Sequence, residues 1–220
     1  MSVIKLLPAS FRERHRFLWH KIQDSLDHGR RAFHQRPLPR NKDGRVYIHL
    51  GCGPVDHPLF INVDTMGRSH IDYVNRVESL PMFPEGYADL IYCSHCLEHI
   101  PMNKTREVLA EWRRILKVGG ILRLAVPNFD AIIDIYNANQ GNIGAVEAFL
   151  MGGQTYAANF HYAVFNESSL REHLEAVGFR NVSRWKHEDY PETAVEDCST
   201  MMIATPKGER LISLNLQAVK

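Results

Sequence analysis

Two motifs in the first half of the chain have residue types and spacing suited to binding a ligand. Residues 46–50 read as a buried strand that runs into Gly51-Cys52-Gly53. Glycine lets a backbone turn tightly and approach a ligand without a Cβ clash. Asp64 follows Gly51 by 13 residues and ends the next predicted strand, where a carboxylate can accept both hydroxyls of a ribose. Each motif alone also fits an ordinary turn.

A second group of reactive side chains occupies residues 93–99, Cys-Ser-His-Cys-Leu-Glu-His. A Cys-x-x-Cys pair beside histidines is typical of zinc, but no second ligand pair stands at suitable spacing. Cys93 closes an apolar strand, so we expect no metal here. Glu98 suits either a general base or a carboxylate at a helix start, and His99 either lines a site or caps local structure.

The third candidate is a histidine among aromatic residues, in the sequence Asn159-Phe160-His161-Tyr162. Histidine is the side chain best suited to proton transfer near neutral pH. We expect residues 128–165 to form an insertion that covers the site, which makes His161 the first candidate for a catalytic base. A histidine satisfied by local hydrogen bonds is the alternative.

Alternating strands and helices must position these motifs. Residues 103–117 are expected to form a helix that ends at Gly119-Gly120, and residues 167–177 a helix capped by Asn166. The pattern predicts an α/β fold with a seven-stranded, mostly parallel sheet, an antiparallel C-terminal strand and helices on both faces. The predicted strands cover residues 46–50, 60–64, 71–75, 88–93, 121–126, 179–185, 200–205 and 211–219.

Charge is distributed unevenly along the 220 residues, whose net charge is +1. Residues 1–45 hold 11 Lys and Arg against 4 Asp and Glu. We expect residues 1–44 to be a basic extension with a helix over 10–34, either a solvated face or a surface that pairs two subunits as a homodimer, and 45–220 to be the main domain. The extension lacks the interleaved aromatics of single-strand binders, so nucleic acid is not an expected partner.

Targeting signals are not apparent in the sequence. It has no apolar run of the roughly 20 residues that a membrane span needs, and no signal-peptide pattern at its start. Four cysteines in a chain of this length do not suggest a disulfide framework. We therefore expect a cytoplasmic protein with no membrane span.

The order of the motifs resembles class I S-adenosylmethionine-dependent methyltransferases. The resemblance spans residues 46–128 and rests on LGCGP, INVD, ADLIYCSHCLEHI and EWRRILKVGGILRLAVPN. A small bacterial subgroup of predicted methyltransferases, often associated with surface polysaccharide genes, is similar in its later segments as well. The resemblance implies a Rossmann-like fold with S-adenosylmethionine as cofactor.

The resemblance also implies which residues bind the cofactor. Asp64 would bind the ribose, and Arg76 and Val77 would lie beside the adenine. Ser94 and His95 would contact the methionine moiety. Arg76 departs from the pattern, because many members have an acid there that accepts the adenine amino group, and arginine has no acceptor. The methionine end would meet the strand end and turn, Leu50, Gly51, Cys52, Gly53 and Pro54.

Transfer of a methyl group to a hydroxyl requires a base for the departing proton. We predict an O-methyltransferase for a small-molecule or saccharide acceptor, with His161 as base and His95 or His99 as second choices. An amine acceptor would need no single essential base. Two alternatives remain: a binding protein that kept the fold without the chemistry, and a nicotinamide oxidoreductase, disfavoured by the missing third glycine of Gly-x-Gly-x-x-Gly.

Overall fold

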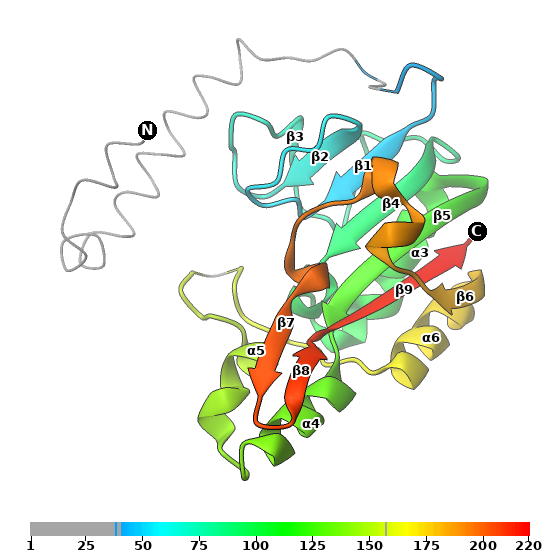
Figure 1. Ribbon diagram of the computed structural model, residues 1–220. Coiled ribbons are helices and arrows are strands. Elements are labelled where there is room, and N and C mark those ends of the chain that lie inside the picture. Colours follow the sequence, from blue (N-terminus) through cyan, green and yellow to red (C-terminus); the bar gives the residue numbers. More distant parts are fainter. Residues whose placement is uncertain (1–37, 39–40, 157) are drawn as a thin grey trace, which may run out of the picture.

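The computed structural model describes residue 38, residues 41–156 and residues 158–220. Its main feature is a seven-stranded sheet in the order β3-β2-β1-β4-β5-β9-β6 (Figure 1). Every neighbouring pair from β3 to β5 is parallel, and β9 is antiparallel to both β5 and β6. The strands are β1 Tyr47–Leu50, β2 Phe60–Asp64, β3 Tyr73–Val74, β4 Ala88–Ser94, β5 Leu116–Pro127, β6 Arg180–Arg184 and β9 Ser213–Val219.

The predicted sheet and its antiparallel C-terminal strand are confirmed. The late strands differ in detail from the prediction. A hairpin of β7, Met202–Thr205, and β8, Gly208–Leu211, forms a separate two-stranded sheet, and β9 lies inside the main sheet between β5 and β6.

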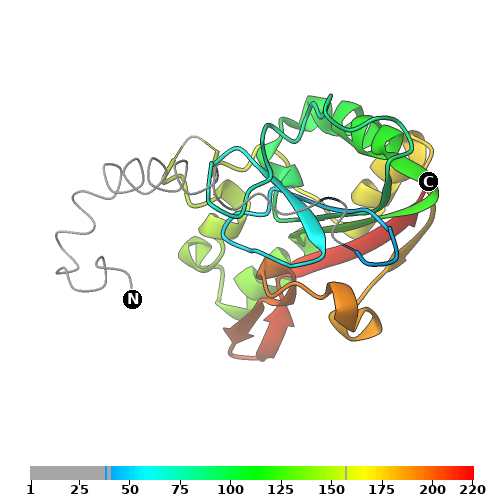
Figure 2. The same ribbon diagram turned by 90° about the horizontal axis from the view of Figure 1, so that it is seen from above.

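Helices lie around this sheet. On one face lie α3, Thr105–Ile115, and α6, Glu167–Ala176 (Figures 1 and 2). Trp185 and Val195 pack on the opposite face against Phe60 and Tyr92. The segment that carries Val195 contains short 3-10 turns, η5 His187–Asp189, η6 Pro191–Thr193 and η7 Cys198–Thr200.

A third group of elements lies beyond the carboxyl ends of the parallel strands (Figure 1). It comprises α4, Phe129–Ala138, the 3-10 turn η4, Ile143–Ala145, α5, Glu147–Met151, and the β7–β8 hairpin. Ile132 and Ile135 of α4 pack with Val146 and Ile212 in a small apolar cluster. The insertion between β5 and α6 is therefore largely folded, and it stands next to the sheet edge where α/β proteins bind ligands.

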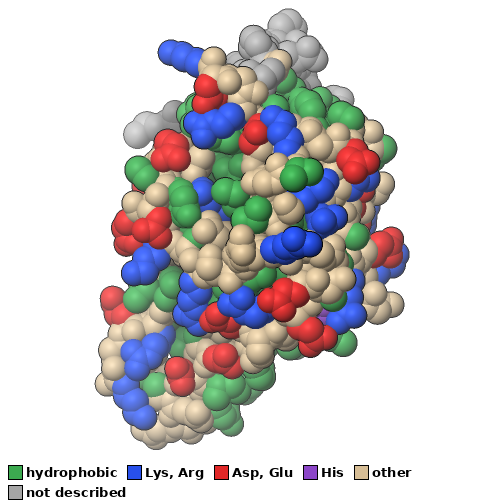
Figure 3. Space-filling view, turned by 90° about the vertical axis from the view of Figure 1, so that its right-hand side faces the viewer, with side chains coloured by type: hydrophobic (Ala, Val, Ile, Leu, Met, Phe, Trp, Pro, Cys, Tyr) green, Lys and Arg blue, Asp and Glu red, His purple; other side chains and the backbone are tan. Residues whose placement is uncertain are grey.

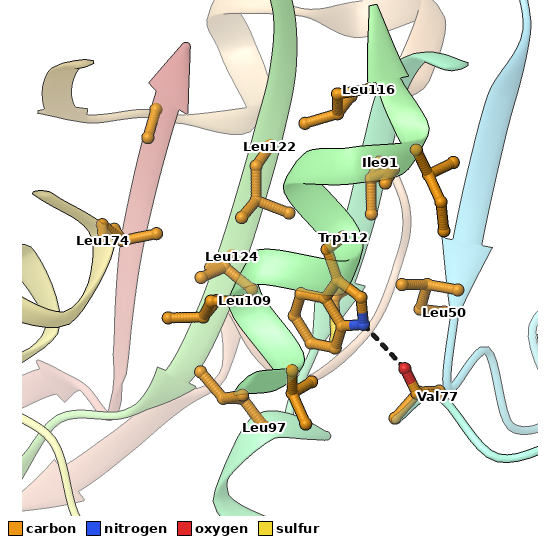
Figure 4. Close-up of a cluster of buried hydrophobic side chains, with 14 of the residues drawn as sticks. Leu50, Val77, Ile91, Leu97, Leu109, Trp112, Leu116, Leu122, Leu124 and Leu174 are labelled. Carbon is orange, nitrogen blue, oxygen red and sulfur yellow. Dashed lines mark hydrogen bonds between the residues drawn. The ribbon is translucent and has the colours of Figure 1, made fainter. Parts of the chain in front are cut away.

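The main core forms between the sheet and α3. Leu109 and Trp112 on α3 are fully buried, and the Trp112 indole donates a hydrogen bond of 2.8 Å to the Val77 carbonyl (Figure 4). Each Å² of apolar area that such a side chain removes from water stabilises the fold by about 25 cal/mol. Because Val77 follows β3, this contact also fixes the loop between β3 and β4.

No helix forms between β1 and β2, where residues 51–59 form turns and irregular backbone. The predicted helix end at Gly119-Gly120 is wrong, because α3 ends at Ile115 and Leu116 is already extended. Gly119 and Gly120 lie inside β5, where Gly119 has a φ of +79° and its N–H bonds the Lys220 carbonyl at 3.1 Å. The helix at 167–176, with its Asn166 cap, is confirmed.

Figure 3 shows acidic and basic side chains interspersed over the face on the right-hand side of Figure 1. Arg184 and Arg171 both pair with Glu167. The expected basic extension and its helix over 10–34 lie outside the described residues. Among the helices that the structure describes, none is long and apolar enough to cross a bilayer.

Candidate active site

The glycine turn connects the first strand to the second at the carboxyl edge of the sheet. The Gly51 N–H donates to the Val63 carbonyl at 2.9 Å, and its φ of +65° favours glycine. A Cβ at Gly51 would lie 2.5 Å from the Cys96 Sγ, whereas a Cβ at Gly53 would meet nothing within 4 Å. Gly51 therefore permits close packing, and Gly53 leaves backbone open to a ligand.

Asp64 closes the turn from the end of β2. One of its carboxylate oxygens accepts the Gly53 N–H and the other accepts the Met66 N–H, each at 2.8 Å. A carboxylate has about four acceptor positions, so two remain for ribose hydroxyls. The side chain is half-buried rather than enclosed, so a ligand can reach it.

The other residues expected near the methionine end differ in what they expose. Leu50 and Cys52 are buried, and burial raises the pKa of the Cys52 thiol. Their side chains belong to the core, which leaves their backbone for ligand contact. Pro54 is exposed beside the turn.

The two residues expected beside the adenine, Arg76 and Val77, differ in their burial. Arg76 is exposed and pairs with Glu78, an acid that the sequence reasoning passed over. Val77 is buried in the main core, so only its backbone could contact an adenine.

Residues 94–99 turn away from the end of β4 beside the glycine turn. Ser94 is buried, and its Oγ has no hydrogen-bond partner among the described residues. His95 has a φ of +48°, a region that non-glycine residues rarely adopt. Its Nε2 lies 3.1 Å from the Ser213 Oγ and its Nδ1 lies 3.4 Å from a Glu98 oxygen. Strain of this kind is concentrated at functional sites.

Glu98 and His99 on η2, Leu97–His99, meet His161 from the insertion. The His161 Nε2 lies 3.9 Å from a Glu98 oxygen, and the His99 and His161 ring centroids are 4.7 Å apart. The Glu98 carbonyl accepts the Tyr162 N–H at 2.8 Å, which ties the two segments together. We call Glu98, His99 and His161 the acceptor-side cluster.

Glu98 is the buried member of the acceptor-side cluster, and the two histidines are partly buried. Glu98 is 1% exposed, and neither carboxylate oxygen has a hydrogen-bond partner among the described residues. Burial lowers the pKa of His161, and the nearby Glu98 carboxylate partly offsets that shift. Buried polar groups without partners are rare in folded proteins and require an explanation.

The two cysteines of the Cys-x-x-Cys pair lie differently. Cys93 is fully buried in β4, and burial raises its pKa, with a further contribution from Cys96. Cys96 is the side chain against Gly51. All four cysteines are free, and the two thiols of the pair serve packing around the glycine turn.

Tyr156 of the insertion is an exposed residue that sequence reasoning did not single out. Partial desolvation raises the pKa of its phenol, and the charge of Asp64 adds to the shift. Nothing in the local sequence signals this proximity to Asp64, because it depends on how the insertion folds.

The chain is an α/β protein whose glycine turn lies at the carboxyl ends of β1 and β2, the edge where such sheets bind ligands. A family model for a methyltransferase domain matches residues 62–124. This segment runs from β2 through β5 and includes Glu98 and His99. A search of curated proteins finds no match.

Solved structures similar to this chain are methyltransferases by their descriptions. An S-adenosylmethionine-dependent methyltransferase from Methanosarcina mazei has a TM-score of 0.51 at 15% identity, covering 82% of this chain and 94% of that one. One from Archaeoglobus fulgidus has a TM-score of 0.49 at 17% identity, covering 94% and 100%. The 1,6-didemethyltoxoflavin-N1-methyltransferase of Burkholderia thailandensis, solved with its substrate and S-adenosylhomocysteine, has 0.48 at 17%, covering 96% and 84%.

The match over residues 62–124 is to a methyltransferase domain, and the sheet has the Rossmann-like order expected for class I methyltransferases. The residues present fit the cofactor: Gly53 leaves open space at the turn, and Asp64 keeps acceptor positions for the ribose. When bound, S-adenosylmethionine supplies an activated methyl group and a good leaving group. The nicotinamide alternative finds no support.

Proposed function

We propose that this methyltransferase transfers the methyl group to a hydroxyl of a small molecule or saccharide. The observation that carries the proposal is the acceptor-side cluster. Glu98 and His99 lie on the segment that packs against the glycine turn through Cys96, and His161 reaches them from the insertion. Methylation of a hydroxyl needs a group that takes its proton, and imidazoles are suited to that task. A cluster of this kind has no necessary role in methylating an amine.

His161 is the first candidate for this proton acceptor. Its Nδ1 lies 3.0 Å from the Phe149 carbonyl, an atom that can only accept, so the proton of a neutral ring sits on Nδ1. The Nε2 then carries a lone pair directed at the cluster. His99 has the same arrangement with the Phe160 carbonyl at 3.0 Å and is a second choice. His95 is the other, with Ser213 holding its ring.

The test replaces His161 with Gln, which keeps the size and polarity of the side chain and removes the base. For a hydroxyl acceptor we expect turnover to fall at least tenfold, about 1.4 kcal/mol in activation free energy. Initial rates measured over a panel of sugars, phenols and amines would check this. His173→Gln, a histidine on α6, is the matched control and should leave turnover unchanged.

Transfer to amines with undiminished turnover in His161→Gln would contradict the hydroxyl assignment. Binding of S-adenosylhomocysteine without transfer to any acceptor would instead favour the binding-protein alternative.

Location and assembly remain predictions of the sequence. The four free cysteines are in keeping with the expected cytoplasmic location, a reducing compartment. A homodimer formed through the basic extension would be detected as a loss of mass in solution after deletion of residues 1–40.

A further inference from the structure

We infer that Glu98, His99 and His161 hold a divalent transition-metal ion beside the methyl-transfer site. One donor atom from each of the three side chains lies within 4.8 Å of the other two. The inference deepens the proposed function and rests on it for the role of the ion, whereas the site itself rests on geometry alone.

The Glu98 carboxylate is the first observation. It is 1% exposed and has no hydrogen-bond donor at either oxygen among the described residues. Its nearest basic atoms are the His95 Nδ1 at 3.4 Å and the His161 Nε2 at 3.9 Å, and neither makes a hydrogen bond to it. Buried charges in proteins are paired or coordinate a metal. A cation among these side chains would satisfy both oxygens.

The second, independent observation is the orientation of the two imidazoles. The His99 Nδ1 bonds the Phe160 carbonyl and the His161 Nδ1 bonds the Phe149 carbonyl, each at 3.0 Å. Histidines that bind metals almost always donate their other ring N–H to a carbonyl or carboxylate, which fixes the tautomer. In both rings this arrangement leaves the Nε2 lone pair for an ion.

The distances are close to those of a loaded site. Bonds of about 2.0–2.2 Å from an ion to three ligands in a tetrahedral site place the donor atoms about 3.4 Å apart. The observed donor atoms lie within 4.8 Å of one another, so side-chain rotation has to bring them together by at most roughly 1.4 Å.

The ligand set, two imidazoles and one carboxylate, indicates which class of ion would bind. Imidazole nitrogen suits Zn²⁺, Fe²⁺, Ni²⁺ and Cu²⁺, whereas Mg²⁺, Ca²⁺ and Mn²⁺ prefer ligand sets made of oxygen. Three protein ligands also leave coordination positions open, as in catalytic rather than structural sites. Cys93 is not one of the three donors, because its side chain is fully buried in β4.

An open position gives the ion a role in the proposed reaction. A hydroxyl bound to a divalent ion loses its proton more readily, so the proton can leave to His95 or to water. The acceptor oxygen then forms its bond to the methyl carbon, the bond from that carbon to sulfur breaks, and the electron pair of the broken bond stays on sulfur. His161 would act here as a metal ligand, and the ion would replace it as the activator of the hydroxyl.

The test is a calorimetric titration of Zn²⁺, Mn²⁺ and Mg²⁺ into the full, tag-free chain after treatment with a chelator. We expect one Zn²⁺ per chain, bound with micromolar or tighter affinity and more tightly than Mn²⁺ or Mg²⁺. Glu98→Gln and His99→Gln should each weaken binding by roughly 100-fold, the upper end of what the loss of an outer-shell partner costs. His173→Gln should bind as the unchanged chain does.

A Co²⁺ titration followed by absorption keeps the inference testable if a variant fails to fold. We expect ligand-field bands without a thiolate charge-transfer band. Absence of binding, equal binding by Glu98→Gln, or a thiolate band would each overturn the inference. None of these readouts needs an acceptor, so the two hypotheses can fail separately. A metal-free enzyme that methylates hydroxyls would contradict only the metal site. A metal-bound enzyme that methylates only amines would contradict only the proposed function.

Discussion

The carboxylates in the two halves of the site differ in their hydrogen bonding. On the cofactor side, both oxygens of Asp64 accept backbone N–H groups at 2.8 Å. On the acceptor side, Glu98 is more deeply buried, and its oxygens have no hydrogen-bond partner among the described residues. The cofactor half therefore has its carboxylate hydrogen bonds in place as folded, whereas the acceptor half leaves its carboxylate without a hydrogen-bond donor among the described residues.

The largest expected effect concerns the packing that joins the halves. Gly51→Ala would force a Cβ to within 2.5 Å of the Cys96 Sγ at a φ of +65°. We expect a loss of about 3 kcal/mol in the free energy of unfolding, the sum of overpacking and left-handed strain. Urea denaturation would measure it.

Gly44→Ala is the matched control, because Gly44 has a φ of +78° but open space around its Cβ position. It should cost about 1–2 kcal/mol from strain alone. Equal losses at Gly51 and Gly44 would show that the contact with Cys96 is unimportant.

Asp64→Asn is expected to destabilise the chain without ligand. The amide keeps one acceptor oxygen and loses the charge that two backbone N–H groups now share. Hydrogen bonds to charged groups contribute about 1.5–3 kcal/mol, so we expect a loss of about 2 kcal/mol. Chemical denaturation of the cofactor-free protein would measure it, and no loss would contradict a stabilising role for these hydrogen bonds.

Glu98→Gln should act in the opposite direction in the metal-free chain. A neutral amide costs less to bury without partners than a carboxylate does, so we expect a gain of about 1 kcal/mol. Thermal unfolding in a chelator would show a higher Tm together with lower turnover. A lower Tm would mean that Glu98 already has a partner within the protein.

Arg76→Ala should have the smallest effect. The side chain is 75% exposed and pairs only with Glu78 among the described residues. Exposed ion pairs contribute at most about 1 kcal/mol, so we expect a change in stability under that value and an unchanged affinity for S-adenosylhomocysteine. Loss of cofactor affinity would restore the adenine role expected from the sequence.

Local signals predicted the two strands that flank the glycine turn. The strand before Gly51 and the strand before Asp64 form as expected, since apolar runs that stop at turn residues carry their own boundaries. The helix end predicted from Gly119 and Gly120 was wrong, because glycine also permits an irregular strand start. The pairing of β5 with β4 and β9 keeps this segment in the sheet.

The acceptor half was only partly accessible from sequence. His95, Glu98 and His99 stand within five residues and were visible as a group. His161 lies 63 residues after Glu98, and only the folding of α4 and α5 brings the two together. The lack of a partner for Glu98 is a property of the packed structure and leaves no trace in the sequence.

The most direct test of the division into two halves is calorimetric binding of S-adenosylhomocysteine to Asp64→Asn and Glu98→Gln. Loss of charge-assisted bonds to the ribose should weaken binding to Asp64→Asn about tenfold or more. Glu98→Gln should bind the compound as tightly as the unchanged chain while losing turnover. Equal weakening in both variants would contradict separate donor and acceptor halves.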